Sequence, residues 1–389
     1  MNAWGKLAGR YAGREDDKHK ILALDGGGIR GILTLEVLAR MEEMLAAATG
    51  GGPDFRLCHF FDYVGGTSTG AIIAAGLARG MSVKELLAFY QETGPAMFDK
   101  QFILKRWRAL YKSEPLKKEL QRTFGAETCL KPDDLECLLL AVLRNRTTDS
   151  PWPVSSNPQA LYNAAPRSDC NLKIPLWKIV RASTAAPVYF PPEVIQWDPD
   201  DERKTFVFVD GGLTPYNNPA FLLFRMATEP GYRLNWASGE DKLLLMSIGT
   251  GAAAAVEDDE ADLSPGLIEN VAALPGALMH AAMVDQDTNC RFVGRCVHGA
   301  VLDREIGDMI PRDADGKMIP LSRDLGRRFL YARYSADLSR KGLAAMGLPD
   351  ITPKNVQKLD SIAHIGDLRR VGRKVAAEIK LEHFGNFIS

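Results

Sequence analysis

The sequence has no apolar run of the length that a membrane-spanning helix needs. Its first twenty residues also lack the apolar segment of a secretory signal, so we expect a cytoplasmic protein whose membrane contact is peripheral. Excess charge of one sign is missing as well, because the formal net charge is only -1. That balance argues against a broad electrostatic surface for a nucleic-acid polymer.

Cysteine and histidine are scarce, with six residues of each kind. The cysteines are scattered without a C-x-x-C pair, which favours reduced thiols over a disulfide framework. The sequence contains neither an H-E-x-x-H motif nor a calcium-binding loop, so it predicts no metal or other cofactor. None of the histidines lies in a predicted strand-end loop, where a catalytic base is expected.

A G-x-S-x-G motif, Gly66 to Gly70, lies between a short apolar strand ending at Val64 and an alanine-rich helical run over 71–78. In a strand–turn–helix elbow of this kind, the serine, here Ser68, is exposed on a sharp turn. The glycines at both ends avoid collisions between the turn, the strand and the helix. The pentapeptide alone also fits an ordinary turn with an N-capping serine.

A glycine-rich turn, D-G-G-G-I-R-G over 25–31, follows a buried strand over 21–24 and opens a helix over 32–45. Gly26, Gly27 and Gly28 would expose backbone N–H groups to an anion, as in an oxyanion hole. Arg30 would contact a substrate phosphate or pin the loop.

The same turn fits the G-x-G-x-x-G pattern of dinucleotide-binding folds, through Gly26, Gly28 and Gly31. That alternative requires an acidic residue at the end of the next strand, whereas this strand ends in the Ser68 elbow.

Asp210 follows a predicted strand over 205–209 and precedes Gly211 and Gly212. An acidic residue at this point lies where parallel α/β sheets carry their chemistry. The plain alternative is an aspartate that closes an Asx-turn. Asn218 is expected to cap the next helix, with Pro219 at its first position.

The chain divides into three predicted parts. Its middle contains a helix-rich insertion with a strand over 138–142 and a basic and aromatic stretch over 98–112. This stretch either covers the active site at a lipid surface or packs its aromatic face into the core. The predicted parts are an N-terminal arm over 1–20, a core over 21–260 with a cap-like helical insertion over 80–150, and a helical C-terminal extension over 261–389 packed on the core.

Together with the segment Ala185 to Pro191, the three motifs resemble the patatin-like phospholipase family over about residues 20–250. The resemblance implies a three-layer α/β/α fold, with a mostly parallel central sheet and helices on both faces. It also implies that Ser68 is the nucleophile and Asp210 its dyad partner, with Gly26, Gly27, Gly28 and Arg30 around the oxyanion. A triad would need His280 or His298, and His280 lies on an apolar helix face typical of a core residue.

The implied function is a lipid acyl hydrolase of the phospholipase A type, which cleaves fatty acyl esters of membrane phospholipids at the inner membrane through an acyl-enzyme. Two alternatives are a dinucleotide-binding oxidoreductase built on Gly26 to Gly31 and a catalytically silent binding scaffold.

The region beyond residue 260 is similar to extensions of bacterial patatin-like enzymes, including those switched on by cyclic nucleotides in anti-phage defence. A cyclic nucleotide is therefore a candidate activator, and a homo-oligomer is a candidate assembly. Arg291, Arg295 and Arg304 either contact such an anion or are exposed on helices packed against the sheet.

Overall fold

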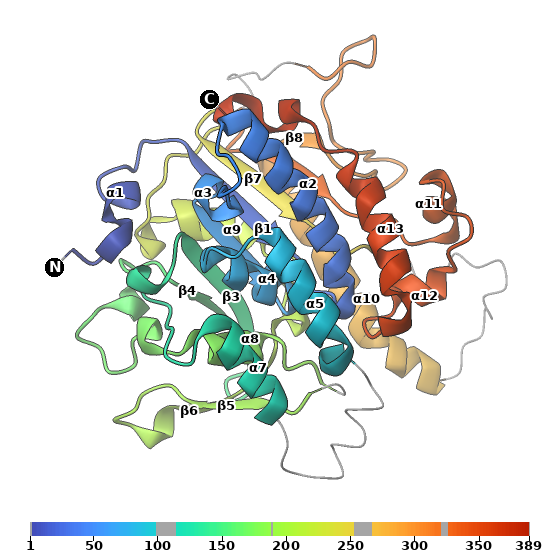
Figure 1. The fold of residues 1–389 in the computed structure, drawn as a ribbon. Helices are drawn as coiled ribbons and strands as arrows, with labels where there is room; N and C mark the ends of the chain where they lie inside the picture. The colour runs from blue at the N-terminus through green and yellow to red at the C-terminus, as the bar shows by residue number, and fades with distance from the viewer. Residues whose placement is uncertain (1, 99–113, 188–189, 253–266, 320–325, 389) are drawn as a thin grey trace.

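The computed structural model describes residues 2–98, 114–187, 190–252, 267–319 and 326–388. The described strands form one sheet in the order β5-β6-β3-β2-β1-β7-β9-β8, with β4 also paired to β3 (Figure 1). The run from β3 to β8 is parallel, whereas β4, β5 and β6 pair antiparallel at one edge. The strands are β1 (His19–Leu24), β2 (Tyr63–Thr67), β3 (Leu138–Asn145), β4 (Ser150–Ser155), β5 (Glu193–Gln196), β6 (Thr205–Asp210), β7 (Leu243–Ile248), β8 (Arg295–His298) and β9 (Leu330–Tyr334).

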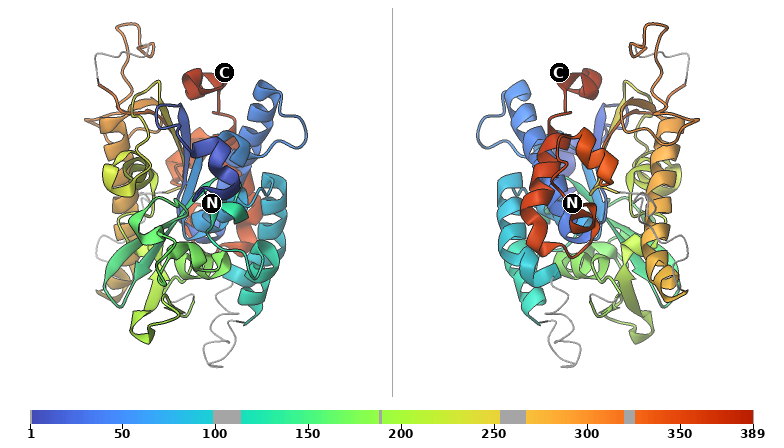
Figure 2. Two further views of the ribbon diagram at one scale, coloured as in Figure 1. Left: turned by 90° about the vertical axis from the view of Figure 1, so that its left-hand side faces the viewer. Right: turned by 90° about the vertical axis from the view of Figure 1, so that its right-hand side faces the viewer.

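Helices cover both faces of this sheet (Figure 2). The described α-helices are α1 (Ala8–Tyr11), α2 (Gly31–Thr49), α3 (Leu57–Phe60), α4 (Thr69–Ala78), α5 (Val83–Phe98), α7 (Glu114–Phe124), α8 (Leu176–Ser183), α9 (Ala220–Thr228), α10 (Leu267–Val293), α11 (Arg340–Ala345), α12 (Pro353–Gln357) and α13 (Ile365–Ala376). Over the described ranges, none of these helices is long and apolar enough to cross a bilayer.

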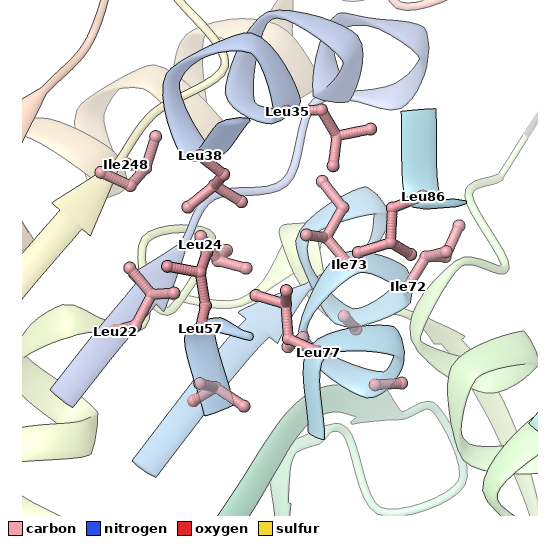
Figure 3. Close-up of a cluster of buried hydrophobic side chains, with 14 of the residues drawn as sticks. Leu22, Leu24, Leu35, Leu38, Leu57, Ile72, Ile73, Leu77, Leu86 and Ile248 are labelled. Carbon is pink, nitrogen blue, oxygen red and sulfur yellow. The ribbon is translucent and has the colours of Figure 1, made fainter. Parts of the chain in front are cut away.

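Alternate side chains of the central strands enter two different hydrophobic cores. Leu22 and Leu24 of β1 lie in the larger core, whereas Ile21 and Ala23 lie in the smaller one beside α9. This follows from the two-residue repeat of a strand, which points successive side chains to opposite faces. In the larger core, Leu38 of α2 lies above Leu24 (Figure 3). The predicted three-layer fold with a mostly parallel sheet is confirmed.

The N-terminal residues pack against the sheet instead of forming a free arm. Trp4, Leu7 and Tyr11 are buried in the smaller core. Arg10 of α1 makes an ion pair of 3.0 Å with Asp62, just before β2. Because β1 begins at His19, the expected boundary at residue 20 falls inside a strand.

The insertion expected over 80–150 ends earlier than predicted. Its helices α5 and α7 are followed by β3, which pairs with β2 in the main sheet and contains the strand expected over 138–142. Residues 99–113 lie outside the described residues, and with them nearly all of the basic and aromatic stretch.

The C-terminal region differs from the helical extension that the sequence predicts. It adds β9 and β8 to the same sheet, next to β7. These strands have only five and four residues, too few to display a clear alternating pattern. Helix α13 packs on α2, where Glu36 accepts hydrogen bonds from Arg369 and Arg373 (Figure 1). The region is therefore part of the sheet's layered structure.

Candidate active site

Ser68 lies on a strained turn between β2 and α4. Its φ of 54° and ψ of -121° are unusual for a residue with a side chain. A Cβ on Gly66 would collide with the backbone of Gly70, and one on Gly70 would collide with the carbonyl oxygen of Leu24. The turn can therefore close only with glycine at both positions, which is the steric requirement of a nucleophile elbow.

Ser68 and Asp210 come together although 142 positions separate them in the sequence. The Ser68 hydroxyl donates a hydrogen bond of 2.6 Å to Asp210 Oδ2, and the Gly212 N–H donates one of 2.7 Å to Asp210 Oδ1. Both carboxylate oxygens thus have partners, and the Asp210 side chain has one oxygen directed at the serine. Among the described residues, no histidine is hydrogen-bonded to either member of this pair.

Burial sets the acidity of this carboxyl group. Asp210 is 5% exposed. Burial raises its pKa to about 6 from an ordinary 3.8, and the hydrogen bonds from Ser68 and Gly212 oppose that rise only in part. An aspartate with this pKa accepts a proton more readily than an exposed one while remaining ionised near neutral pH.

A second serine supports the elbow. Ser183, the last residue of α8, accepts a hydrogen bond of 3.0 Å from the Ser68 N–H and donates one of 2.7 Å to the Val142 carbonyl. The Asp210 N–H donates to the Ala185 carbonyl at 3.0 Å, so the end of α8 and the residues just after it hold both Ser68 and Asp210. Sequence reasoning missed Ser183, because one serine among alanines and threonine carries no distinguishing signal.

The glycine-rich turn lies directly beside Ser68. A Cβ on Gly26 would lie 3.3 Å from the Ser68 Cβ. The Gly26 N–H donates to the Asn217 carbonyl at 3.0 Å and is not free for a ligand, in contrast to the prediction for this residue. For Gly27 and Gly28, the described residues supply no acceptor to the N–H groups. These two amides are the candidate oxyanion donors.

The Arg30 side chain contacts the glycine-rich turn from the buried side. The side chain is buried, and its Nε donates to the Gly27 carbonyl at 3.4 Å. Burial lowers the pKa of Arg30 to about 10, against the attraction of Asp25. Of the two predicted roles, this contact fits pinning of the glycine loop.

Other expectations need correction. Helix α9 begins at Ala220, so Pro219 precedes its first position, although Asn218 Oδ1 does accept the Ala220 N–H at 3.0 Å. Arg291 and Arg295 are both buried, which contradicts the idea of exposed arginines and leaves neither open to a ligand. Arg304 is exposed.

His280 and His298 remain outside the Ser68–Asp210 pair. His280 is only half-buried, and its Nδ1 atom has no hydrogen-bond partner in the described structure, unlike a satisfied core histidine. His298 pairs with Glu378 at 3.2 Å and stacks on Tyr334. Within the described ranges, no group of three or more histidine, cysteine or acidic residues could hold a metal ion.

Comparisons with known proteins show which family this sequence resembles. A sequence profile of the patatin-like phospholipase family matches residues 22–224. A cGAMP-activated phospholipase of Vibrio cholerae is 33% identical over 228 residues, which cover 54% of this chain and 59% of that protein. Patatin-2-Kuras 1 of Solanum tuberosum is 28% identical over 247 residues, covering 59% of this chain and 62% of that protein.

A third relative is an intracellular phospholipase A2 of Caenorhabditis elegans. It is 29% identical over 255 residues, which cover 64% of this chain and 21% of that protein. The chain thus spans less than two thirds of the length of each of these three relatives. The profile match includes the glycine-rich turn, Ser68 and Asp210, and it ends before β7.

Proposed function

The chain belongs to the patatin-like phospholipase family, and from that premise we propose that it hydrolyses fatty acyl esters of membrane phospholipids with a Ser68–Asp210 dyad. The observation that carries the proposal is the hydrogen bond of 2.6 Å from the Ser68 hydroxyl to the buried Asp210 carboxylate. A nucleophile within hydrogen-bonding reach of a base is the arrangement that covalent acyl transfer requires.

In the first half of the proposed reaction, Ser68 Oγ attacks the ester carbonyl and Asp210 Oδ2 takes the hydroxyl proton. The negative charge that develops on the carbonyl oxygen is stabilised by the N–H groups of Gly27 and Gly28. Collapse of this intermediate expels the lysophospholipid oxygen, which takes the proton back from Asp210. The fatty acid remains as an ester on Ser68.

In the second half, Asp210 removes a proton from water, which attacks the carbonyl carbon of the acyl-enzyme. Collapse of the second intermediate breaks the bond to Ser68 Oγ, which takes the proton from Asp210, and the fatty acid leaves. The raised pKa of Asp210 suits both halves, because the group must gain a proton and then lose it near neutral pH. The proposal includes action at a membrane surface from the cytoplasmic side.

The test is release of fatty acid from phospholipid vesicles. Wild type should release it, whereas Ser68→Ala and Asp210→Ala should not. His280→Ala and His298→Ala are the matched controls and should retain activity, because neither side chain contacts the pair. Loss of activity in either control would favour a triad. Saturable NAD(P) binding, with a Ser68→Ala variant that behaves as wild type, would favour the oxidoreductase.

Regulation by a cyclic nucleotide is a second part of the proposal, and it draws on the name of the Vibrio cholerae relative. Arg291 and Arg295 do not support it, because both are buried. Thermal stability measured with a panel of cyclic dinucleotides tests the idea. A melting temperature that none of them shifts would contradict it.

A further inference from the structure

A chain of four buried charges connects the glycine-rich turn to the C-terminal region. Asp25, the residue before the three glycines, receives two hydrogen bonds from Arg333 of β9, of 2.6 Å and 3.2 Å. Arg333 Nε also lies 3.6 Å from Asp287 of α10, and Asp287 makes a two-point pair with Arg291 at 2.8 Å and 2.9 Å. All four residues are at least nine-tenths buried.

The order of the strands makes this contact possible. In the sheet, Ala23 of β1 is opposite Ser247 of β7, and Ser247 is opposite Arg333. The three side chains therefore share one face of the sheet. Arg333 reaches across the small serine, to which it donates a hydrogen bond of 2.6 Å, and arrives at Asp25. The distance from β9 across β7 to Asp25 requires a long side chain on β9 and a small residue on β7.

The three glycines cannot orient themselves, because they have no side chains to pack. The backbone of Gly26 is held by the Asn217 carbonyl and the Thr250 hydroxyl, and the turn is held at its two ends by Asp25 and Arg30. The C-terminal region supplies one more contact, since the Ile29 N–H donates to the Leu359 carbonyl at 3.0 Å. A Cβ on Gly28, where φ is +61°, would collide with that carbonyl. The direction of the Gly27 and Gly28 amides thus depends in part on residues beyond position 330.

We propose that Arg333 is a positioning residue for the oxyanion hole, because its pair with Asp25 holds the glycine turn against Ser68. The inference rests on the proposed hydrolase function and extends it to a region outside the family match. A buried ion pair is by itself weak evidence for a role in stability. Buried ion pairs can often be replaced by well-packed apolar residues at no loss of stability.

The experiment compares Arg333→Gln, Asp25→Asn and the double variant by kcat, KM and Tm for hydrolysis of a short-chain p-nitrophenyl ester. Each single change removes the contact that holds the start of the turn, so we expect kcat to fall by about 100-fold with KM within about twofold of wild type. Because both residues act through one contact, the double variant should lose no more kcat than either single variant.

The double variant also separates positioning from folding. Arg333→Gln leaves an unpaired buried carboxylate and should lower Tm, and adding Asp25→Asn removes that charge and should restore much of the loss. The proposal predicts that kcat stays low while Tm recovers. Recovery of kcat together with Tm would overturn it, since the pair would then serve folding only.

Two further variants keep the result decisive. Arg333→Lys keeps the charge without the two-point geometry and should recover only part of kcat. Arg10→Gln breaks the pair with Asp62 away from the turn, so it should lower Tm and leave kcat unchanged. If Arg333→Gln does not fold, Asp25→Asn and the double variant answer the same question.

The outcomes distinguish this inference from the proposed function. A wild-type protein without esterase activity would refute both the proposed hydrolase function and the positioning role of Arg333. A double variant with wild-type kcat, together with an inactive Ser68→Ala, would refute only the positioning role of Arg333.

Discussion

Replacing Asp210 by asparagine should stabilise the protein near neutral pH while abolishing catalysis. Burial raises the pKa of Asp210 from 3.8 to about 6, so the folded state holds the ionised carboxylate at a cost. At about 1.4 kcal/mol for each tenfold change in the dissociation constant, the difference amounts to about 3 kcal/mol. Asparagine has no charge to bury, and it can accept the Gly212 N–H and donate to Ser68 Oγ.

The sign of the effect follows from proton binding. Between pH 3.8 and about 6 the folded wild type binds more protons than the unfolded chain, so its stability falls as pH rises through this window. Above pH 6 the full cost is present, and below pH 3.8 it disappears. The gain of Asp210→Asn over wild type should therefore be small near pH 4 and nearly complete by pH 7.

The assay is thermal unfolding of both proteins from pH 4 to pH 8. With an unfolding entropy of about 2 cal/mol/K per residue, a gain of about 3 kcal/mol raises the Tm of a 389-residue chain by about 4 °C. Asp200→Asn is the control, because Asp200 is exposed and its charge costs little in the folded state. A Tm difference for Asp210→Asn that does not change with pH would refute the assigned role of burial.

Three other predictions concern the same elements. The kcat for ester hydrolysis should rise with pH through about 6, because only the ionised Asp210 accepts the serine proton; a pH–rate profile that is flat from pH 5 to pH 8 would contradict this. Ser183→Ala removes the hydroxyl that is bonded to both the Ser68 N–H and the Val142 carbonyl, so it should lower the free energy of unfolding by about 1–3 kcal/mol in urea titrations. An unchanged unfolding midpoint would mean that these hydrogen bonds are dispensable. Gly70→Ala should lower the free energy of unfolding in urea by at least about 1–3 kcal/mol, because the new Cβ would collide with the backbone of β1. Gly366→Ala in α13 is the control and should not destabilise the protein, because its new Cβ has no neighbour within 4 Å; equal effects of the two changes would refute the steric explanation.

The elbow and the glycine turn were predictable because their constraints are local. The backbone can adopt the Ser68 turn only with glycine at 66 and 70, so the requirement is written into five consecutive residues. The strand–turn–helix context around each motif could also be read from short apolar runs. The pairing of Asp210 with Ser68 was predicted from the order of the motifs along the chain. The distance between the two side chains came only from the structure.

The C-terminal region was not predictable in the same way. Strands β8 and β9 are short and contain arginines, so composition alone would predict that they lie at the surface. Arg333 is buried because Asp25, more than 300 positions away, accepts its hydrogen bonds, and no local pattern reports such a partner. Arg291 pairs with Asp287 one helical turn earlier, but the Ala300 and Asp308 carbonyls that complete its burial follow the helix and have no sequence signal. Ser183 was missed for a related reason, since its two hydrogen bonds go to distant strands and turns.

Detection of the acyl-enzyme tests the central claim most directly. The protein is mixed with a p-nitrophenyl ester, quenched in acid, digested and analysed by mass spectrometry. The account predicts that the acyl group is found on the peptide containing Ser68, and that Ser68→Ala shows neither the adduct nor turnover. An acyl group on another residue, or turnover that persists in Ser68→Ala, would contradict it.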